Sequence, residues 1–280
     1  MTVRTAAFAD SVGALYDHIS PAVEHALVET LKTFGRTVPA PRNDPFYGLD
    51  RRSDLALRTL GRMTAHGDFR KYVFVLDAGG GLGGVARWLT LTYGCRVLVL
   101  DVLPRLLATG QRLTARARLS GRVASVAGSF EAIPVRDGVF TQIWSVEALQ
   151  HANDRRRAVA ELFRVLRPGS TLALHEVVRS STRVAPIGGP WLHGTEDEYL
   201  AILGDTGFVN VTTEDVTTER SEPSAITRSA EETFLRLLAE RDPDEANAWR
   251  RHRDEVRAIA DVEHGPDFRA MQFFARRPSV

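Results

Sequence analysis

The sequence predicts an α/β protein in which a helical cap precedes a doubly wound, parallel sheet. From residue 72 the chain alternates apolar, strand-like runs with helix-like segments, which is typical of a parallel sheet covered by helices. The first strand-like run ends in a glycine turn, Gly79–Gly84, that opens a helix. Over residues 1–35 apolar side chains recur every three or four positions, which indicates helices without a strand partner.

The cap is expected over residues 1–70, and the sheet domain over residues 71–280. Pro21 suits the first turn of a helix, and a further helix is expected near residues 55–63. Three prolines between them break any helix and lead into an aromatic loop with Phe46 and Tyr47.

Seven strands are predicted in the second part of the chain. They are Tyr72–Asp77, Arg96–Leu100, Val123–Ala127, Thr141–Ser145, Ser170–Val178, Phe208–Thr212 and Ala270–Ala275. Helices are expected between them at about 83–93, 104–119, 154–165 and 195–204. Residues 222–262 are charged and prone to form helix, so a helical insertion over about 180–265 is expected before the last strand.

Composition excludes several classes of function. The 280 residues are 44% hydrophobic and 25% charged, as in an ordinary globular domain. A net charge of +1 gives no reason to expect nucleic acid or a membrane as partner. The single cysteine, Cys95, allows neither an internal disulfide nor a cysteine-cluster metal site, and we predict no metal. Without a long apolar run or a leader segment, a cytoplasmic protein with a small-molecule substrate is expected, and a homodimer stays open.

Two carboxylates accompany the glycine turn. Gly79, Gly81 and Gly84 fit G-x-G-x-x-G, which alone would also suit a dinucleotide. Asp77 stands where a dehydrogenase usually keeps an apolar or small residue, so it either faces a bound cation or caps its own loop. Asp101, at the end of the second strand, is placed to accept both ribose hydroxyls of an adenosine; the alternative is that it caps the next helix.

Four motifs follow one another at regular intervals: Asp77–Gly81, Asp101, Phe140–Ser145 and Glu161–Gly169. Together they resemble class I S-adenosylmethionine-dependent methyltransferases, and the similarity covers roughly residues 70–215. The resemblance implies a Rossmann-like, seven-stranded sheet whose last strand is antiparallel, and S-adenosyl-L-methionine as cofactor. Its segment E-x-x-R-V-L-x-P-G has no place in dinucleotide oxidoreductases.

The resemblance also implies which residues bind this cofactor. Asp77 and the glycines face its methionine part, and Asp101 holds its ribose. Ser129 stands where the family usually has an acidic residue for the adenine, so Phe130 is expected to contribute by its backbone or by packing on the base. Tyr16 either closes over the cofactor or only packs its helix. The complete predicted set is Asp77, Gly79, Gly81, Asp101, Val102, Ser129, Phe130, Ser145 and Tyr16.

The candidate catalytic residues follow from a second resemblance. Residues 144–151 are similar to the segment that lines the active site in bacterial sugar O-methyltransferases of the rebeccamycin type. There the tail reads L-H-H; His151 matches the second histidine and Gln150 replaces the first, while Glu176 matches an acidic residue near the end of strand five.

Each candidate has an alternative role. His151 is the expected base, because an imidazole titrates near neutral pH, although it also suits a positioning role in its loop. Glu147 is predicted to orient the substrate or contact the cofactor amine, and Glu176 to assist His151, each with a structural role as the alternative. His175 points to the opposite strand face from Glu176 and is expected to be a packing residue.

These observations predict a methyltransferase acting on an oxygen or carbon of a small secondary metabolite, as in antibiotic biosynthesis. The cap and the insertion would enclose an apolar pocket lined by Phe46, Tyr47, Trp144 and Trp191. Two alternatives stay open. One is an enzyme of the same fold that catalyses cyclisation or rearrangement with the cofactor as filler. The other is a binding module without activity, against which Asp77 and Asp101 argue.

Overall fold

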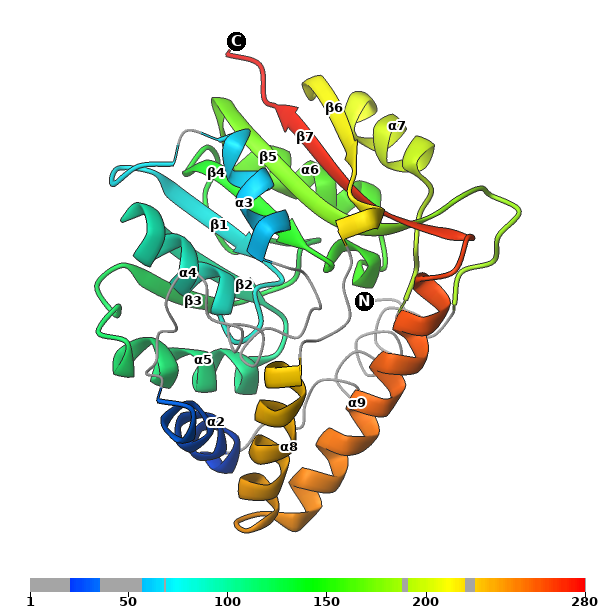
Figure 1. The fold of residues 1–280 in the computed structure, drawn as a ribbon. Coiled ribbons are helices and arrows are strands. Elements are labelled where there is room, and N and C mark those ends of the chain that lie inside the picture. The colour runs from blue at the N-terminus through cyan, green and yellow to red at the C-terminus, as the bar shows by residue number, and fades with distance from the viewer. Residues whose placement is uncertain (1–20, 36–56, 68, 188–190, 220–224, 280) are drawn as a thin grey trace.

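A computed structural model describes residues 21–35, 57–67, 69–187, 191–219 and 225–279. One seven-stranded sheet organises them, with the strand order β3-β2-β1-β4-β5-β7-β6. All neighbouring pairs from β3 to β5 are parallel, and β7 runs antiparallel to both β5 and β6 (Figure 1). The predicted sheet, including its antiparallel last strand, is confirmed.

The strands lie close to their predicted positions. Their bounds are β1 Phe74–Ala78, β2 Arg96–Asp101, β3 Val123–Ala127, β4 Phe140–Val146, β5 Leu166–Arg179, β6 Val209–Asp215 and β7 Phe268–Arg276. The largest difference is at β5, which begins at Leu166 rather than Ser170. Leu166 already pairs with Phe140, and Gly169 adopts a left-handed φ of 76° that lets the strand continue past Pro168 after a register irregularity.

Helices cover both faces of the sheet. Their bounds are α3 Leu57–Ala65, α4 Gly84–Tyr93, α5 Pro104–Arg116, α6 Arg155–Val165 and α7 Glu196–Thr206. Helix α6 begins as predicted, because the Asp154 side chain accepts a hydrogen bond from Arg157 N. Helix α7 begins with a capping box between Thr195 and Glu198.

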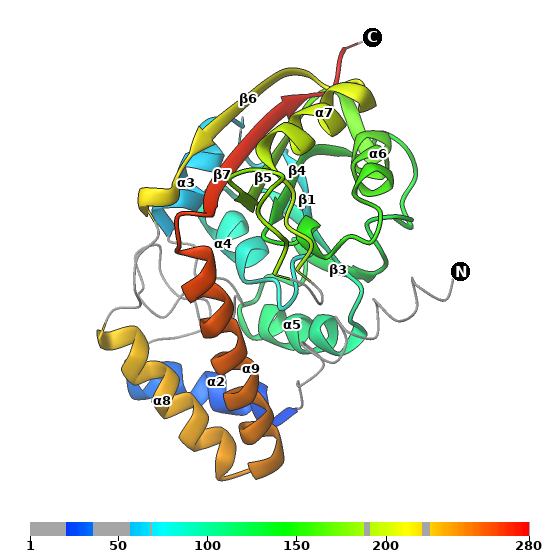
Figure 2. The ribbon, with the colours of Figure 1, turned by 90° about the vertical axis from the view of Figure 1, so that its right-hand side faces the viewer.

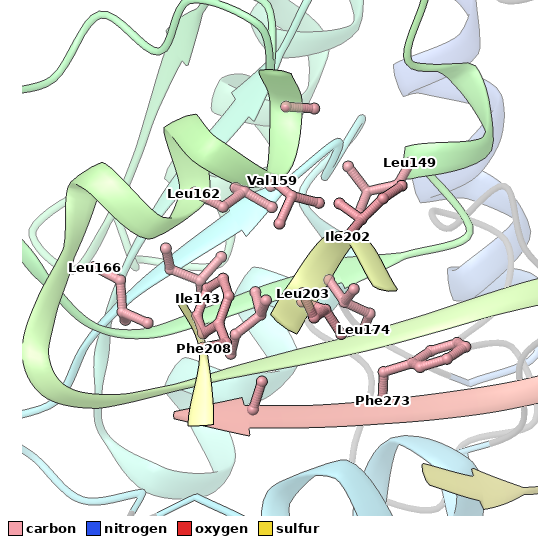
Figure 3. Packing of buried hydrophobic residues seen from close by; sticks show 14 of the residues in the cluster. Ile143, Leu149, Val159, Leu162, Leu166, Leu174, Ile202, Leu203, Phe208 and Phe273 are labelled. Carbon is pink, nitrogen blue, oxygen red and sulfur yellow. The ribbon is translucent and has the colours of Figure 1, made fainter. Parts of the chain in front are cut away.

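The strands bury one apolar row on each face. On one face Leu76, Ile143, Leu174 and Phe273 pack against α6 and α7; Figure 3 shows how Val159, Leu162, Ile202, Leu203 and Phe208 close over this row. On the other face a second cluster joins strand residues to α3, α4 and α5. Both rows alternate along the strands, as side chains in a pleated sheet must.

A group of three helices lies beyond the sheet (Figures 1 and 2). It consists of α2 Pro21–Thr33 from the predicted cap and of α8 Ala225–Ala239 and α9 Pro243–Glu263 from the predicted insertion. Leu27 of α2 and Phe234 of α8 share an apolar cluster with Leu82 of the glycine turn. The Glu24 carboxylate of α2 contacts Arg112 and Arg116 of α5 at 2.5 Å each.

The first part of the chain and the insertion therefore meet in one helical layer. Of the predicted cap, α2 and α3 are described; Tyr16, Phe46 and Tyr47 lie outside the described residues. Within the described ranges, no helix combines the length and the apolar character needed to cross a membrane.

Candidate cofactor and acceptor site

The glycine turn after β1 is held where three loops converge. Gly79 N and Gly80 N donate hydrogen bonds to Leu100 O at 2.8 and 3.2 Å, which fixes the turn to the end of β2. Gly79 has a φ of 80°, and a Cβ there would lie 2.4 Å from the Cβ of Ala148 and 3.0 Å from the ring of Phe130. Only glycine fits this contact with the loops that follow β3 and β4.

Asp77 places a buried carboxylate directly under this turn. It is 2% exposed, and its Oδ2 atom has no hydrogen-bond partner among the described residues. Burial and, after it, the charge of Asp101 raise the pKa of Asp77 to about 7, while the Ala86 amide and the Arg87 charge oppose the rise. An orphaned buried oxygen of this kind suits a cationic donor, such as the α-ammonium group of a methionine moiety.

Asp101 bonds to the backbone on both sides of its strand end, without capping α5. Its Oδ2 accepts a hydrogen bond from Gly81 N at 3.0 Å, and its Oδ1 accepts one from Leu103 N at 2.9 Å. These bonds join the glycine turn to the start of α5. The next residue, Val102, is 46% exposed at the same edge of the sheet. Ribose binding by Asp101 and Val102 stays a prediction.

The predicted adenine residues lie on the neighbouring loop. The edge of Phe130 approaches Gly79, so its ring borders the glycine turn. Ser129 Oγ accepts a hydrogen bond from Glu131 N at 3.1 Å. Ser145, at the carboxyl end of β4, is fully buried, and its hydroxyl lacks a partner in the described part of the chain. The glycine turn thus brings Asp77, Phe130 and Ala148 together, as a cofactor that bridges these loops requires.

The segment after β4 has a strained backbone at its first residue. Glu147 adopts a φ of 49°, which is rare for a residue with a side chain. Its backbone N donates to His175 O at 2.7 Å, and its Oε1 atom lies 3.5 Å from Nε2 of His175. His175 is buried as expected, but it is more than a packing residue, because its imidazole forms an ion pair with Glu147 whenever it is protonated.

Glu176 is fully buried and holds the turn after β4. Its Oε1 atom accepts hydrogen bonds from Leu149 N at 3.0 Å and Ala148 N at 3.4 Å. Burial raises its pKa to about 7, against the opposing amide of Leu149 and the charge of Arg155. These bonds give Glu176 a structural role; the predicted assistance to His151 stays a prediction.

His151 ends a short 3₁₀ turn, Leu149–His151, within which it bonds through its backbone to Ala148 O. Its ring faces Trp191 edge-on, with centroids 6.1 Å apart. Leu192 N donates to Gln150 O, which further joins the insertion to this turn. The insertion therefore contacts the candidate catalytic segment, and enclosure of an acceptor by the insertion stays a prediction.

Trp144 does not line a pocket, which corrects the prediction. It is 0% exposed, and its ring lies 5.3 Å from that of Phe69 and 6.5 Å from that of Trp88. Its position in β4 directs it to the face covered by α3 and α4, so it belongs to the core. Phe46, Tyr47 and Tyr16 lie outside the described residues.

Two polar residues near the site were not predicted to act there. Arg87 and His175 are each 2% exposed, and each lies beside an acidic site residue. The signal for Arg87 was a lone cation inside the apolar run Val85–Leu89. In the described part of the chain, no three His, Cys, Asp or Glu side chains gather as a metal site requires.

Comparison with known proteins matches this region to a family described as "Methyltransferase domain", over residues 76–174. Among curated relatives, the sarcosine/dimethylglycine N-methyltransferase of Halorhodospira halochloris is 31% identical over 59% of this chain and 62% of its own length. The chain covers only 26%, 62% and 53% of the first three curated relatives.

Solved structures show the same fold. The [4+2]-cyclase SpnF superposes with a TM-score of 0.65 at 22% identity, covering 96% of both chains. The geranyl diphosphate C-methyltransferase of Streptomyces coelicolor A3(2), solved with Mg²⁺, geranyl diphosphate and S-adenosyl-L-homocysteine, superposes with a TM-score of 0.60 at 17% identity over 86% of both chains.

Proposed function

We propose that this chain, whose residues 76–174 match a methyltransferase-domain family, is a class I S-adenosylmethionine-dependent methyltransferase that transfers a methyl group to a small secondary metabolite. The observation that carries the proposal is the orphaned, buried Oδ2 atom of Asp77 beneath a glycine turn. The site fits the cofactor, because Asp77 would take its ammonium group and the glycines leave room for its methionine part. S-adenosyl-L-methionine supplies a methyl group on a sulfonium, and S-adenosyl-L-homocysteine is the product.

The acceptor would lie at the carboxyl ends of β4 and β5. Methyl transfer from a sulfonium requires alignment of the acceptor atom more than strong base catalysis. Glu147, whose side chain is 22% exposed, and His151, beside Trp191, are the groups placed to orient an acceptor there. An oxygen acceptor is our first choice, because either side chain can take its proton; a carbon acceptor is the second.

The proposal is tested in two steps. Isothermal titration with S-adenosyl-L-methionine and S-adenosyl-L-homocysteine is expected to show binding at one site. If neither compound binds, the proposal is wrong. Incubation of candidate metabolites with methyl-deuterated cofactor is then followed by mass spectrometry. A product that carries the deuterated methyl group shows transfer.

A second candidate is a cyclase of the same fold. It is favoured by Gln150 in place of a catalytic histidine and by the full-length superposition with a [4+2]-cyclase. The mass spectrum separates the two functions, because a cyclase converts its substrate into an isomer without the deuterated group.

Substitution of His151 is expected to identify the proton acceptor. If His151 removes the proton from a hydroxyl, His151→Gln lowers kcat by about 10²–10⁴-fold and leaves the affinity for S-adenosyl-L-homocysteine within about twofold. Glu147→Gln is the matched comparison, since it also replaces a titrating group by an amide. A larger fall in kcat for Glu147→Gln than for His151→Gln would assign the proton to Glu147 instead.

A further inference from the structure

Arg87 is a fully buried arginine behind the cofactor site. It lies in the first turn of α4, three residues after the glycine stretch ends, and is 2% exposed. A buried guanidinium is costly unless hydrogen bonds and a negative charge compensate it. The contacts of Arg87 therefore indicate what this cation does in the molecule.

The guanidinium holds the carbonyl of the turn. Arg87 Nη1 donates to Leu82 O at 2.6 Å and lies 3.4 Å from both Gly110 O and Thr114 Oγ1 of α5. A Cβ on Gly110 would lie 2.6 Å from Leu82 O, so the carbonyl is pressed against a helix position that only glycine allows. Arg87 thus links the carbonyl of the turn to α5, in addition to the bonds that the turn makes with Leu100 and Asp101.

The Leu82 side chain connects the glycine turn to the outer helices α2 and α8. It is 3% exposed and packs in the apolar cluster that includes Leu27 of α2 and Phe234 of α8. Leu82 therefore contacts Arg87 through its carbonyl and the outer helices through its side chain.

Arg87 also supplies positive charge near two acidic residues. Asp77 is surrounded by Asp101 at the end of β2, the Ala86 amide and Arg87 of α4; Asp101 raises the pKa of Asp77, whereas Arg87 and the amide lower it. Without Arg87, the buried Asp77 would face the negative charge of Asp101, and none of the other groups just named carries a positive charge. The ionised form that a cationic ligand needs would then be less populated.

We infer that Arg87 is a positioning residue of the cofactor site: it fixes the Leu82 carbonyl, and with it the glycine turn, and supplies positive charge behind Asp77. This inference rests on the proposed function, since it names how the same site is prepared. Arg87 acts through Leu82 and Asp77.

The test is titration of the whole chain with S-adenosyl-L-homocysteine at pH 7 in two buffers of different ionisation enthalpy. The wild-type protein is expected to release about half a proton on binding, because Asp77, with a pKa of about 7, becomes ionised. Arg87→Met is expected to bind about tenfold or more weakly and to release close to one proton. A merely structural role would leave the proton release unchanged.

Three further variants make the result decisive. Asp77→Asn removes the proton release, which assigns it to that carboxyl. Arg156→Met, which breaks an exposed ion pair with Asp205, is the matched control and is expected to bind as the wild type does. Arg87→Lys keeps the positive charge but lacks the planar guanidinium group with its several N–H donors. Its affinity for S-adenosyl-L-homocysteine is therefore expected to fall about fivefold or more, with proton release near that of the wild type.

The outcomes separate the two proposals. If the wild-type protein does not bind S-adenosyl-L-homocysteine, the proposed function fails. If it binds, and folded Arg87→Met matches its affinity and proton release, this inference alone is overturned. Should Arg87→Met not fold by circular dichroism, Arg87→Lys decides: wild-type affinity in that variant overturns the inference.

Discussion

Asp77→Asn is expected to stabilise the ligand-free protein while abolishing its affinity for the cofactor. Folding raises the pKa of Asp77 from 3.8 to about 7. The folded state therefore favours the neutral acid, and the contribution of Asp77 to stability is greatest below pH 3.8 and is lost as the pH rises to about 7. At pH 8 this pKa shift lowers the free energy of unfolding by about 4 kcal/mol. A neutral amide at position 77 is expected to recover about 2–4 kcal/mol of it.

The measurement is urea unfolding at pH 5 and pH 8, combined with titration by S-adenosyl-L-homocysteine. Asp77→Asn should raise the free energy of unfolding at pH 8 more than at pH 5, with at least a hundredfold loss of affinity. Asp205→Asn is the matched control, because that carboxylate is 63% exposed in its ion pair and no pH-dependent gain is expected. A destabilised Asp77→Asn protein at pH 8 contradicts the reasoning.

Trp144→Ala is expected to cause the largest loss of stability. The side chain is 0% exposed and packs against the rings of Phe69 and Trp88 in the cluster under α3 and α4. Its removal leaves a large cavity in a close-packed face of the sheet, at a cost of about 3–5 kcal/mol. Urea unfolding monitored by far-UV circular dichroism measures this loss directly.

Trp191→Ala is the comparison for Trp144, since both residues were predicted to line the pocket. Trp191 lies outside the buried apolar clusters of the described residues and faces His151. Trp191 is 6% exposed, so its removal also costs stability, but a smaller loss than at the fully buried Trp144 is expected. Trp144→Phe keeps an aromatic ring and should recover more than half of the stability lost in Trp144→Ala. A loss of less than about 2 kcal/mol for Trp144→Ala would contradict a core position for Trp144.

The sequence by itself determined the order of elements and the strand ends at which the predicted cofactor residues lie. Strand and helix periodicity, the cap at Asp154, the first-turn proline Pro104 and the glycine turn are local features, so each could be predicted from its own segment. Asp77 and Asp101 were correctly placed at the ends of β1 and β2, because the ends of successive parallel strands meet at one edge of the sheet.

Only the tertiary structure decided which partner each side chain meets. The sequence showed an aromatic residue at Trp144 beside the catalytic segment; the sheet face on which it lies put it in the core. The sequence showed Arg87 only as a single cation in an apolar run; the structure shows that it acts on Leu82, Gly110 and Asp77. These contacts join residues that are distant in the chain, and hydrophobic periodicity does not predict which distant residues will meet.

The same reason explains the outer helices. Residues 21–33 and 225–239 were each predicted as helical, in a cap and in an insertion about 200 residues apart. Packing of α2 against α8 makes them one layer, seated on the glycine turn through Leu82. Each amphipathic helix must bury its apolar stripe. Its sequence shows which residues form this stripe, but not which surface of the protein covers it.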